Sequence, residues 1–254
     1  MNLETLCARL DEELRIDAYA DVDGNANGLQ VTRTDQQIDR VAFAVDVADA
    51  TISAAANAHA DLLITHHGLW WQGTDRLTGI DYDRVASLIN ADIGLYTAHL
   101  PLDGHQELGN AAGVADVLDL KNREPFATMH GEPIGQRGSF AGDTSLDAIV
   151  KRLGRGLEGA DEIMTLDFGP PDIAEVGIVT GSGVDYLEAA ADLGLDVLIT
   201  GEGKQHAYHL ARERGIHLVL AGHYATETTG VLALESMLAD WGLDTTYCPH
   251  PTGL

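Results

Sequence analysis

The sequence predicts an α/β protein built from two similar halves that arose by internal duplication. Short apolar runs alternate with longer stretches of helical periodicity along the 254 residues, which favours parallel strands joined by helices. One strand–helix–strand stretch of the first half also recurs in the second half without a gap. In addition, histidine and carboxylate residues follow several of the apolar runs. Together these observations predict two α/β halves with polar groups at their strand ends.

The first half alternates helices and strands. Leu3, Leu6, Leu10 and Leu14 recur at helical spacing and predict an amphipathic helix over 3–16. A turn at 25–28 precedes a short strand at 29–31. The patterns that follow predict strands at 41–45, 62–65 and 93–98, and helices at 46–58, 82–90 and 107–118.

The second half begins with a glycine-rich, less regular segment at 120–143 that contains a strand near 134–140. Beyond it, the patterns predict helices at 146–157, 184–193, 204–214 and 227–241, and strands at 163–168, 176–180, 197–200, 216–221 and 245–248. We therefore expect one half over 1–125 and the other over 126–254, with the segment 223–254 packed back on the first half.

The internal repeat is clearest at a shift of 135 positions. Asp61-Leu-Leu-Ile-Thr65 then falls on Asp196-Val-Leu-Ile-Thr200, and Val41 falls on Val176. A second match, at a shift of 124, brings Ala98-His99 near Gly222-His223 and Asp103 onto Glu227. Both halves thus carry a strand, then a histidine, then an acid four residues later, and their strand ends are expected to face one shared cleft.

The charge is strongly negative. Forty acidic against fifteen basic residues give a net charge of −25. Such a field repels nucleic acid and anionic membranes, so neither is an expected partner. A scattered acidic surface with few lysines is typical of proteins from high-salt cytoplasm, which indicates a halophilic source. With no apolar run of transmembrane length and only two distant cysteines, the expected location is the cytoplasm.

The predicted site starts at His66 and His67, which end an apolar strand. Ligands bind at the carboxyl ends of strands in α/β sheets. Neighbouring residues that leave a strand point in different directions, so the pair suits two nearby ions better than one. The equivalent strand ends supply further donors: His99, Asp103, Glu202, His223 and Glu227. Histidine and carboxylate without cysteine indicate two divalent ions such as zinc, iron, manganese, nickel or magnesium.

Some of these residues allow a second interpretation. Glu202 could line the pocket or act as an acid or base rather than bind metal. Gly181-Ser-Gly183 resembles part of a phosphate cradle but lacks the full spacing, so a tight turn between strand and helix is favoured. Trp70 and Trp71 could stack on a planar substrate or plug the cleft.

An ordered set of motifs resembles the NIF3 family, also called the dinuclear metal-centre proteins or GTP cyclohydrolase I type 2 homologues. The set comprises Asn27-Gly-Leu-Gln30, Leu63-Ile-Thr-His-His67, His99 with Leu102-Asp103, Gly181-Ser-Gly183, Ile199-Thr-Gly-Glu202, and Ala221-Gly-His-Tyr224 with Thr226-Glu227. The resemblance implies two interwoven α/β domains and a toroidal homohexamer.

The same resemblance implies a ligand set for two ions. His66, Asp103 and Glu227 would hold one ion, and His67, His223 and Glu227 the other, with Glu227 as the bridge. Which histidine of the pair faces which ion stays open. His99 and Glu202 would serve in the second shell or as acid and base.

Two function classes follow. The first is a metal-dependent hydrolase that acts on a nucleotide-like or phosphorylated small molecule, with GTP ring opening as one form of the reaction. The second is a non-enzymatic metal-binding ring that works as a metal chaperone or scaffold. Family membership alone does not fix the reaction.

Overall fold

The computed structural model describes residues 1–71, 73 and 76–254. Its internal contacts divide the chain into two compact units. Unit 1 comprises Met1–Leu102 and Val231–His250, and unit 2 comprises Asp103–Gly230 and Pro251–Leu254. The expected boundary near residue 125 differs from this division, because helix α5 (Asn110–Leu118) packs its buried face into the core of the second sheet.

Unit 1 is built on a five-stranded sheet. The strand order is β1 (Gly28–Val31), β4 (Gly94–Thr97), β3 (Leu62–His67), β2 (Arg40–Asp46) and β11 (Asp244–Tyr247). Strands β4, β3, β2 and β11 run parallel, while β1 pairs antiparallel with β4. The first five residues of β3 are buried, as expected of a strand covered on both faces.

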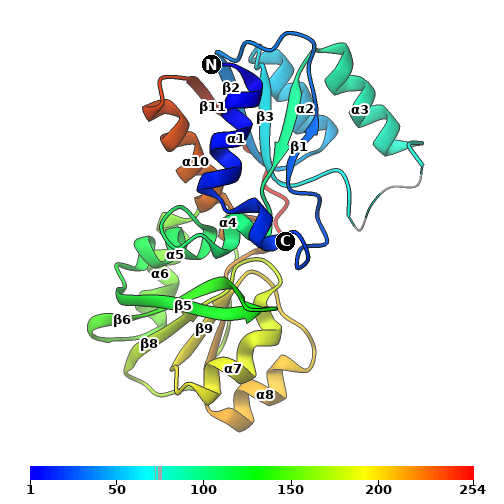
Figure 1. The fold of residues 1–254 in the computed structure, drawn as a ribbon. Helices are drawn as coiled ribbons and strands as arrows, with labels where there is room; N and C mark the ends of the chain where they lie inside the picture. Colours follow the sequence, from blue (N-terminus) through cyan, green and yellow to red (C-terminus); the bar gives the residue numbers. More distant parts are fainter. Residues whose placement is uncertain (72, 74–75) are drawn as a thin grey trace. The chain divides into compact units, whose positions relative to one another are not determined.

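Helices cover both faces of the first sheet (Figure 1). Helices α2 (Asp49–Asn57) and α3 (Ile80–Asn90) lie on one face, where Ile52 and Leu88 join a buried cluster with Leu63. Helices α1 (Leu3–Glu13) and α10 (Thr228–Asp240) lie on the other face. The 3₁₀ helix η1 (Ile16–Tyr19) follows α1, and α4 (Leu100–Gly104) follows β4.

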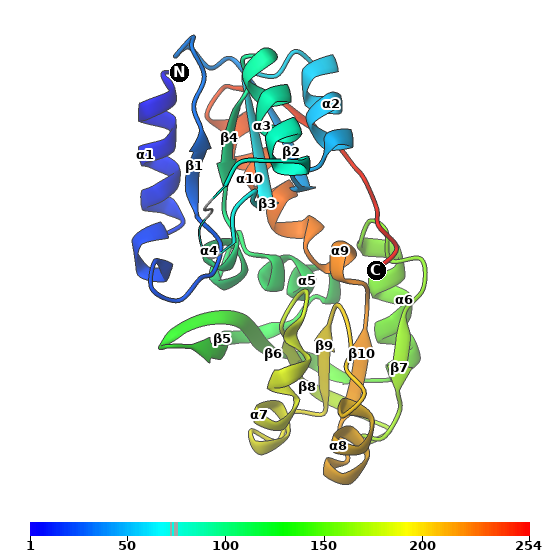
Figure 2. The same cartoon turned by 90° about the vertical axis from the view of Figure 1, so that its right-hand side faces the viewer.

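Unit 2 is built on a six-stranded sheet (Figure 2). The strand order is β5 (Lys121–Met129), β6 (Glu132–Thr144), β8 (Ile173–Ile178), β9 (Val197–Thr200), β10 (His217–Leu220) and β7 (Met164–Leu166). Strands β8, β9 and β10 are parallel, and β6 and β7 flank them antiparallel. Helices α5 and α6 (Leu146–Gly156) cover one face. Helices α7 (Leu187–Asp192) and α8 (Ala207–Arg214) cover the other, and η2 (Gly183–Tyr186) and α9 (His223–Thr226) follow β8 and β10.

The repeat extends to individual hydrogen bonds. The Asp61 carboxylate accepts the amide N–H groups of residues 39 and 40 at 2.9 and 2.8 Å. The Asp196 carboxylate accepts those of residues 174 and 175, both at 2.9 Å. Each donor and acceptor in the second unit lies 135 positions after its counterpart, so the duplicated sequence builds the same local structure twice.

The second sequence match needs a correction of one position. Ala98 donates its N–H to Thr65, and Ala221 donates its N–H to Thr200, so the strands correspond at a shift of 123 rather than 124. One extra residue between β10 and Glu227 accounts for the difference. Aligning the two halves on their histidines and acids did not reveal this insertion.

The hairpin of β5 and β6 is the largest departure from the predicted elements. Only a strand near 134–140 was expected, whereas the strands span 121–129 and 132–144. Lys121-Asn-Arg-Glu-Pro125 carries charges and a proline that argue against a central strand. Strand β5 lies at the edge of its sheet, where a missing N–H is tolerated.

Among the described residues, no helix is long and apolar enough to cross a membrane.

Candidate metal centre

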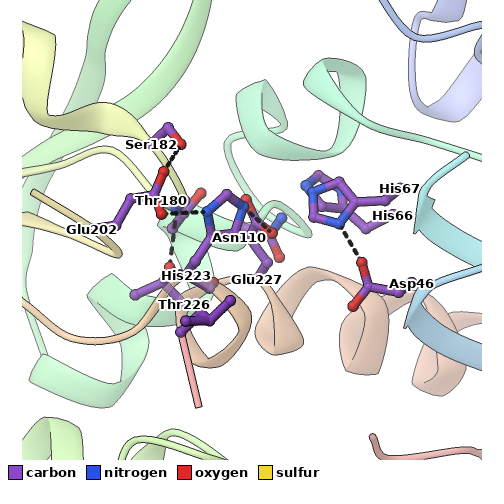
Figure 3. A network of polar contacts seen from close by, with 12 residues as sticks. Asp46, His66, His67, Asn110, Thr180, Ser182, Glu202, His223, Thr226 and Glu227 are labelled. Carbon is purple, nitrogen blue, oxygen red and sulfur yellow. Dashed lines mark hydrogen bonds and ion pairs between the residues drawn. The ribbon is translucent and has the colours of Figure 1, made fainter. Parts of the chain in front are cut away.

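In unit 1, the histidine pair ends strand β3. His66 is fully buried, and its Nδ1 lies 2.9 Å from the carbonyl oxygen of Ala98. The Nδ1 of His67 lies 2.8 Å from Asp46 Oδ1 (Figure 3). Asp46 ends the neighbouring parallel strand and is the register partner of His67. The parallel pairing of β2 and β3 therefore fixes the orientation of the His67 ring.

A third imidazole, that of His99, follows strand β4. Its Nδ1 lies 2.9 Å from Asp23 Oδ1, and the side chain of Asp23 is only 1% exposed. Asp23 also accepts the N–H of Leu100 and the side-chain amide of Asn27. Burial raises the pKa of Asp23, but the hydrogen bond and charge of His99, with the amide donors, outweigh it and hold this pKa below its usual value. Asp23 is thus an ionised, buried anchor for the His99 ring.

The three imidazoles form one cluster. The ring centroid of His66 lies 4.8 Å from that of His67 and 5.0 Å from that of His99, and the centroids of His67 and His99 are 5.6 Å apart. One nitrogen of each ring lies within 4.8 Å of the others, which suits a shared metal ion. Trp71 packs edge-on against His99 at 4.8 Å between centroids and is 46% exposed, so this tryptophan borders the cluster.

In unit 2, Asp103 is a buried carboxylate held by two side chains. Its Oδ1 accepts the amide of Asn110 at 2.8 Å and the hydroxyl of Thr180 at 3.0 Å. Asn110 is itself fixed, because its Oδ1 accepts the N–H of Gly230 at 2.8 Å. The Asp103 carboxylate is thus oriented by Asn110 at the start of α5 and by Thr180 just after β8.

A second donor group in unit 2 consists of His223, Glu227 and Glu202. The Nε2 of His223 lies 3.2 Å from Glu227 Oε2, and its Nδ1 lies 3.5 Å from Glu202 Oε2. Burial lowers the pKa of His223, but Glu227 and Glu202 outweigh it and raise this pKa to about 9. Glu227 is 3% exposed, and Glu202 also accepts the hydroxyl of Ser182 (Figure 3). The two carboxylates therefore favour positive charge at this point.

Glycines make room for these donors. Gly181 has φ +56°, and a Cβ there would overlap Glu227 Oε1 and lie 3.2 Å from His223 Nε2. A Cβ on Gly201 would lie 2.6 Å from His223 Cα. The carbonyl oxygen of Gly181 accepts the N–H groups of Gly201 and Glu202. The Gly181-Ser-Gly183 segment is thus a tight turn packed against Glu227, as the sequence favoured.

The donor set fits divalent ions. Neutral imidazole and carboxylate groups suit zinc, iron, manganese, nickel or magnesium. His66, His67 and His99 are each oriented by an oxygen acceptor, as metal-binding histidines are. Each unit brings its own predicted donors together: His66, His67 and His99 in unit 1, and His223, Glu202 and Glu227 in unit 2. Ligand sets that combine both units stay predictions.

Four supporting residues were missed by the sequence analysis. They are Asp23, Asp46, Asn110 and Thr180, which orient His99, His67 and Asp103. Asp46 could have been found, because it is a polar residue at the end of the strand before the histidine pair. Asp23 lies 76 positions from His99 in an irregular segment, where no periodic pattern marks it.

The fold and these donors define a class of duplicated α/β proteins with histidine and carboxylate groups at the strand ends. The chain belongs to the Duf34/NIF3 (NGG1p interacting factor 3) family, whose model matches residues 1–249. A "GTP cyclohydrolase 1 type 2 homolog" from Halobacterium salinarum is 51% identical over 100% of both chains. One from Deinococcus radiodurans is 41% identical over 96% of this chain and 92% of its own.

Comparison with solved structures supports the same fold. A crystal structure of a Thermus thermophilus protein superposes with a TM-score of 0.91 at 34% identity and covers 100% of both chains. The reduced HcgD protein of Methanocaldococcus jannaschii superposes with a TM-score of 0.85 at 24% identity over 98% of both chains, which extends the fold to distant sequences. The expected family and its α/β fold are therefore confirmed.

Proposed function

We propose that the protein is a dinuclear metal-dependent hydrolase acting on a nucleotide-like or phosphorylated small molecule. The observation that carries this proposal is that unit 1 holds pre-oriented imidazoles, with His66 buried and His67 half-buried, and unit 2 holds the buried carboxylates of Asp103 and Glu227. In the proposed centre, His66, Asp103 and Glu227 hold one ion, and His67, His223 and Glu227 hold the other. Bound divalent ions would polarise a substrate oxygen and lower the pKa of water.

The protein's own residues would orient the donors and handle protons. Asn110 and Thr180 hold Asp103 through two hydrogen bonds, which reduces the rearrangement needed when an ion binds. Glu202 lies 3.5 Å from His223 and has a 47% exposed side chain. We assign Glu202 the transfer of protons between the substrate and solvent, while its contact with His223 orients that imidazole for the ion.

The substrate class follows from charge. A net charge of −25 repels phosphorylated substrates, and no lysine or arginine belongs to the donor groups described above. The ions themselves would supply the positive charge that such a substrate needs. The names of the relatives add GTP as one candidate. The family resemblance further leads us to propose a toroidal homohexamer.

The test is a hydrolysis screen of the metal-loaded full-length protein. Each divalent ion would be supplied in turn, with GTP and an activated phosphodiester as substrates. We expect turnover that Asp103→Asn reduces at least about 100-fold. The exposed Asp240→Asn variant should retain full activity.

Light scattering of the same samples measures assembly. A hexamer that persists in Asp103→Asn separates loss of chemistry from loss of structure. Tight metal binding with no turnover on any substrate would contradict the hydrolase and favour the metal-binding ring.

A further inference from the structure

We propose that Lys204 binds a phosphate group of the substrate that the ions do not hold. This inference rests on the proposed hydrolase and deepens it, because it names a residue that recognises the part of the substrate away from the reacting bond. The predicted ligand is a phosphorylated small molecule whose phosphate oxygens accept hydrogen bonds from the Lys204 ammonium group.

The first step of the argument is the position of Lys204. It lies in the loop after β9, two residues beyond Glu202. The backbone of this loop is fixed, because the N–H groups of Gly201 and Glu202 both donate to the carbonyl oxygen of Gly181. The carboxylate of Glu202 lies 3.5 Å from His223 Nδ1 (Figure 3). Lys204 therefore leaves the loop that brings Glu202 to the donor group of unit 2.

The second step is charge. Three loops of unit 2 follow the parallel strands β8, β9 and β10, at 179–186, 201–206 and 221–227. Lys204 is their only lysine or arginine, against the carboxylates of Asp185, Glu202 and Glu227. Lysine is also rare in the whole chain, with three among 254 residues. A cation at this point supplies the local attraction that the net charge of −25 denies to an anionic substrate.

The third step is the set of donors that the ammonium group keeps. Asp185 Oδ2 lies 2.5 Å from Lys204 Nζ, and Asp185 Oδ1 lies 3.6 Å from His206 Nε2. Within the described part of the chain, Asp185 is the single acceptor of the Lys204 ammonium group. An ammonium group has three N–H donors, so two remain for a ligand. The side chain of Lys204 is 48% exposed, which leaves these donors within reach of a substrate.

Support of the loop does not account for Lys204, since an exposed ion pair of this kind contributes little to stability. An ammonium group forms strong, charge-assisted hydrogen bonds with phosphate oxygens. In that role, Asp185 competes with the phosphate group for the same donors. Removal of the Asp185 charge should therefore strengthen phosphate binding, whereas a purely structural ion pair predicts the opposite.

The experiment measures the binding of GDP and of guanosine to the metal-loaded full-length protein by calorimetry, at a fixed free concentration of the divalent ion. We expect Lys204→Gln to weaken GDP binding about 10-fold, because it removes a charge-assisted hydrogen bond, and to leave guanosine binding unchanged. Lys204→Arg should restore most of the affinity for GDP, and Asp185→Asn should increase it. Lys151→Gln, which removes an exposed lysine from α6, should change neither ligand's affinity.

The outcomes separate this inference from the proposed function. Equal GDP affinities in the wild type and Lys204→Gln would overturn the inference, as would weaker GDP binding in Asp185→Asn or no GDP binding by the wild type. Turnover of the activated phosphodiester tests the hydrolase separately. Turnover without a Lys204 effect on GDP leaves the hydrolase standing and the inference wrong. Lys204-dependent GDP binding without turnover of any substrate supports the inference and contradicts the hydrolase.

Discussion

At the residue scale, Asp61 fixes the start of a strand through charge-assisted hydrogen bonds. Its carboxylate accepts two backbone N–H groups and pairs with Arg33 at 2.6 Å. Burial raises the pKa of Asp61, but the backbone hydrogen bonds and Arg33 outweigh it and lower this pKa. The stabilisation is therefore complete above the unfolded pKa near 3.9 and is lost as the pH falls through the folded value.

We predict that Asp61→Asn lowers the free energy of unfolding by about 1–3 kcal/mol at pH 7, since it removes hydrogen bonds to a charged group. The difference from wild type should shrink as the pH falls below about 4. Urea unfolding from pH 7 to pH 3 measures it. Asp244→Asn, which breaks an exposed ion pair with Arg40, should change stability little. A difference that is constant with pH contradicts this explanation.

Substitution of Gly181 tests how closely the turn after β8 packs against Glu227 and His223. Gly181→Ala combines a left-handed φ with overlap of Glu227, whereas Gly194→Ala has φ +72° and no atom within 4 Å. The conformational cost, about 1–3 kcal/mol, is common to both variants. We predict that only Gly181→Ala also weakens metal binding, as measured by calorimetry. Equal metal affinities in the two variants would show that Glu227 moves without consequence.

The donor residues could be predicted from sequence because the histidines lie at or just after the ends of apolar runs, and Asp103 and Glu227 follow a histidine by four positions. His66 and His67 end β3, and His223 follows β10 after Gly222. Their hydrogen-bond acceptors were harder to predict. Asp23 reaches His99 only after the chain has folded, and Asn110 reaches Asp103 across a helix start. Such contacts leave no periodic pattern in the sequence.

At the element scale, helix α5 belongs to the second sheet although it precedes the expected boundary. Leu118 is fully buried and joins the cluster of Ile149 and Val197. We predict that Leu118→Ala costs about 2–5 kcal/mol of unfolding free energy, since it leaves a cavity in that core. Leu193→Ala, at a 53% exposed position, should cost less than about 0.5 kcal/mol. Equal effects in chemical unfolding would contradict this packing.

The strands that are buried on both faces could be predicted from the sequence. Strands β2, β3, β8 and β9 read as apolar runs because helices cover both faces of their sheets. Strand β5 was missed because an edge strand is stabilised by one neighbour and accepts charged residues and Pro125. Apolar runs in the sequence indicate buried strands, so they do not reveal a strand that is half exposed.

At the scale of the whole molecule, the charge of −25 makes stability depend on salt. The screening length falls from about 10 Å at 0.1 M salt to about 3 Å at 1 M, which removes repulsion among the acidic groups. We predict that the melting temperature rises with KCl into the molar range. Sucrose, which stabilises without screening, is the control. A melting temperature that KCl leaves unchanged would contradict the halophilic interpretation.

The proposed centre holds two divalent ions, and Glu227 serves both. The most direct measurement is elemental analysis of protein purified without added metal or chelator, beside the Glu227→Ala variant. We predict about two ions per chain in the wild type and loss or weakening of both in the variant. A wild type that holds no metal and takes up none on titration would contradict the claim.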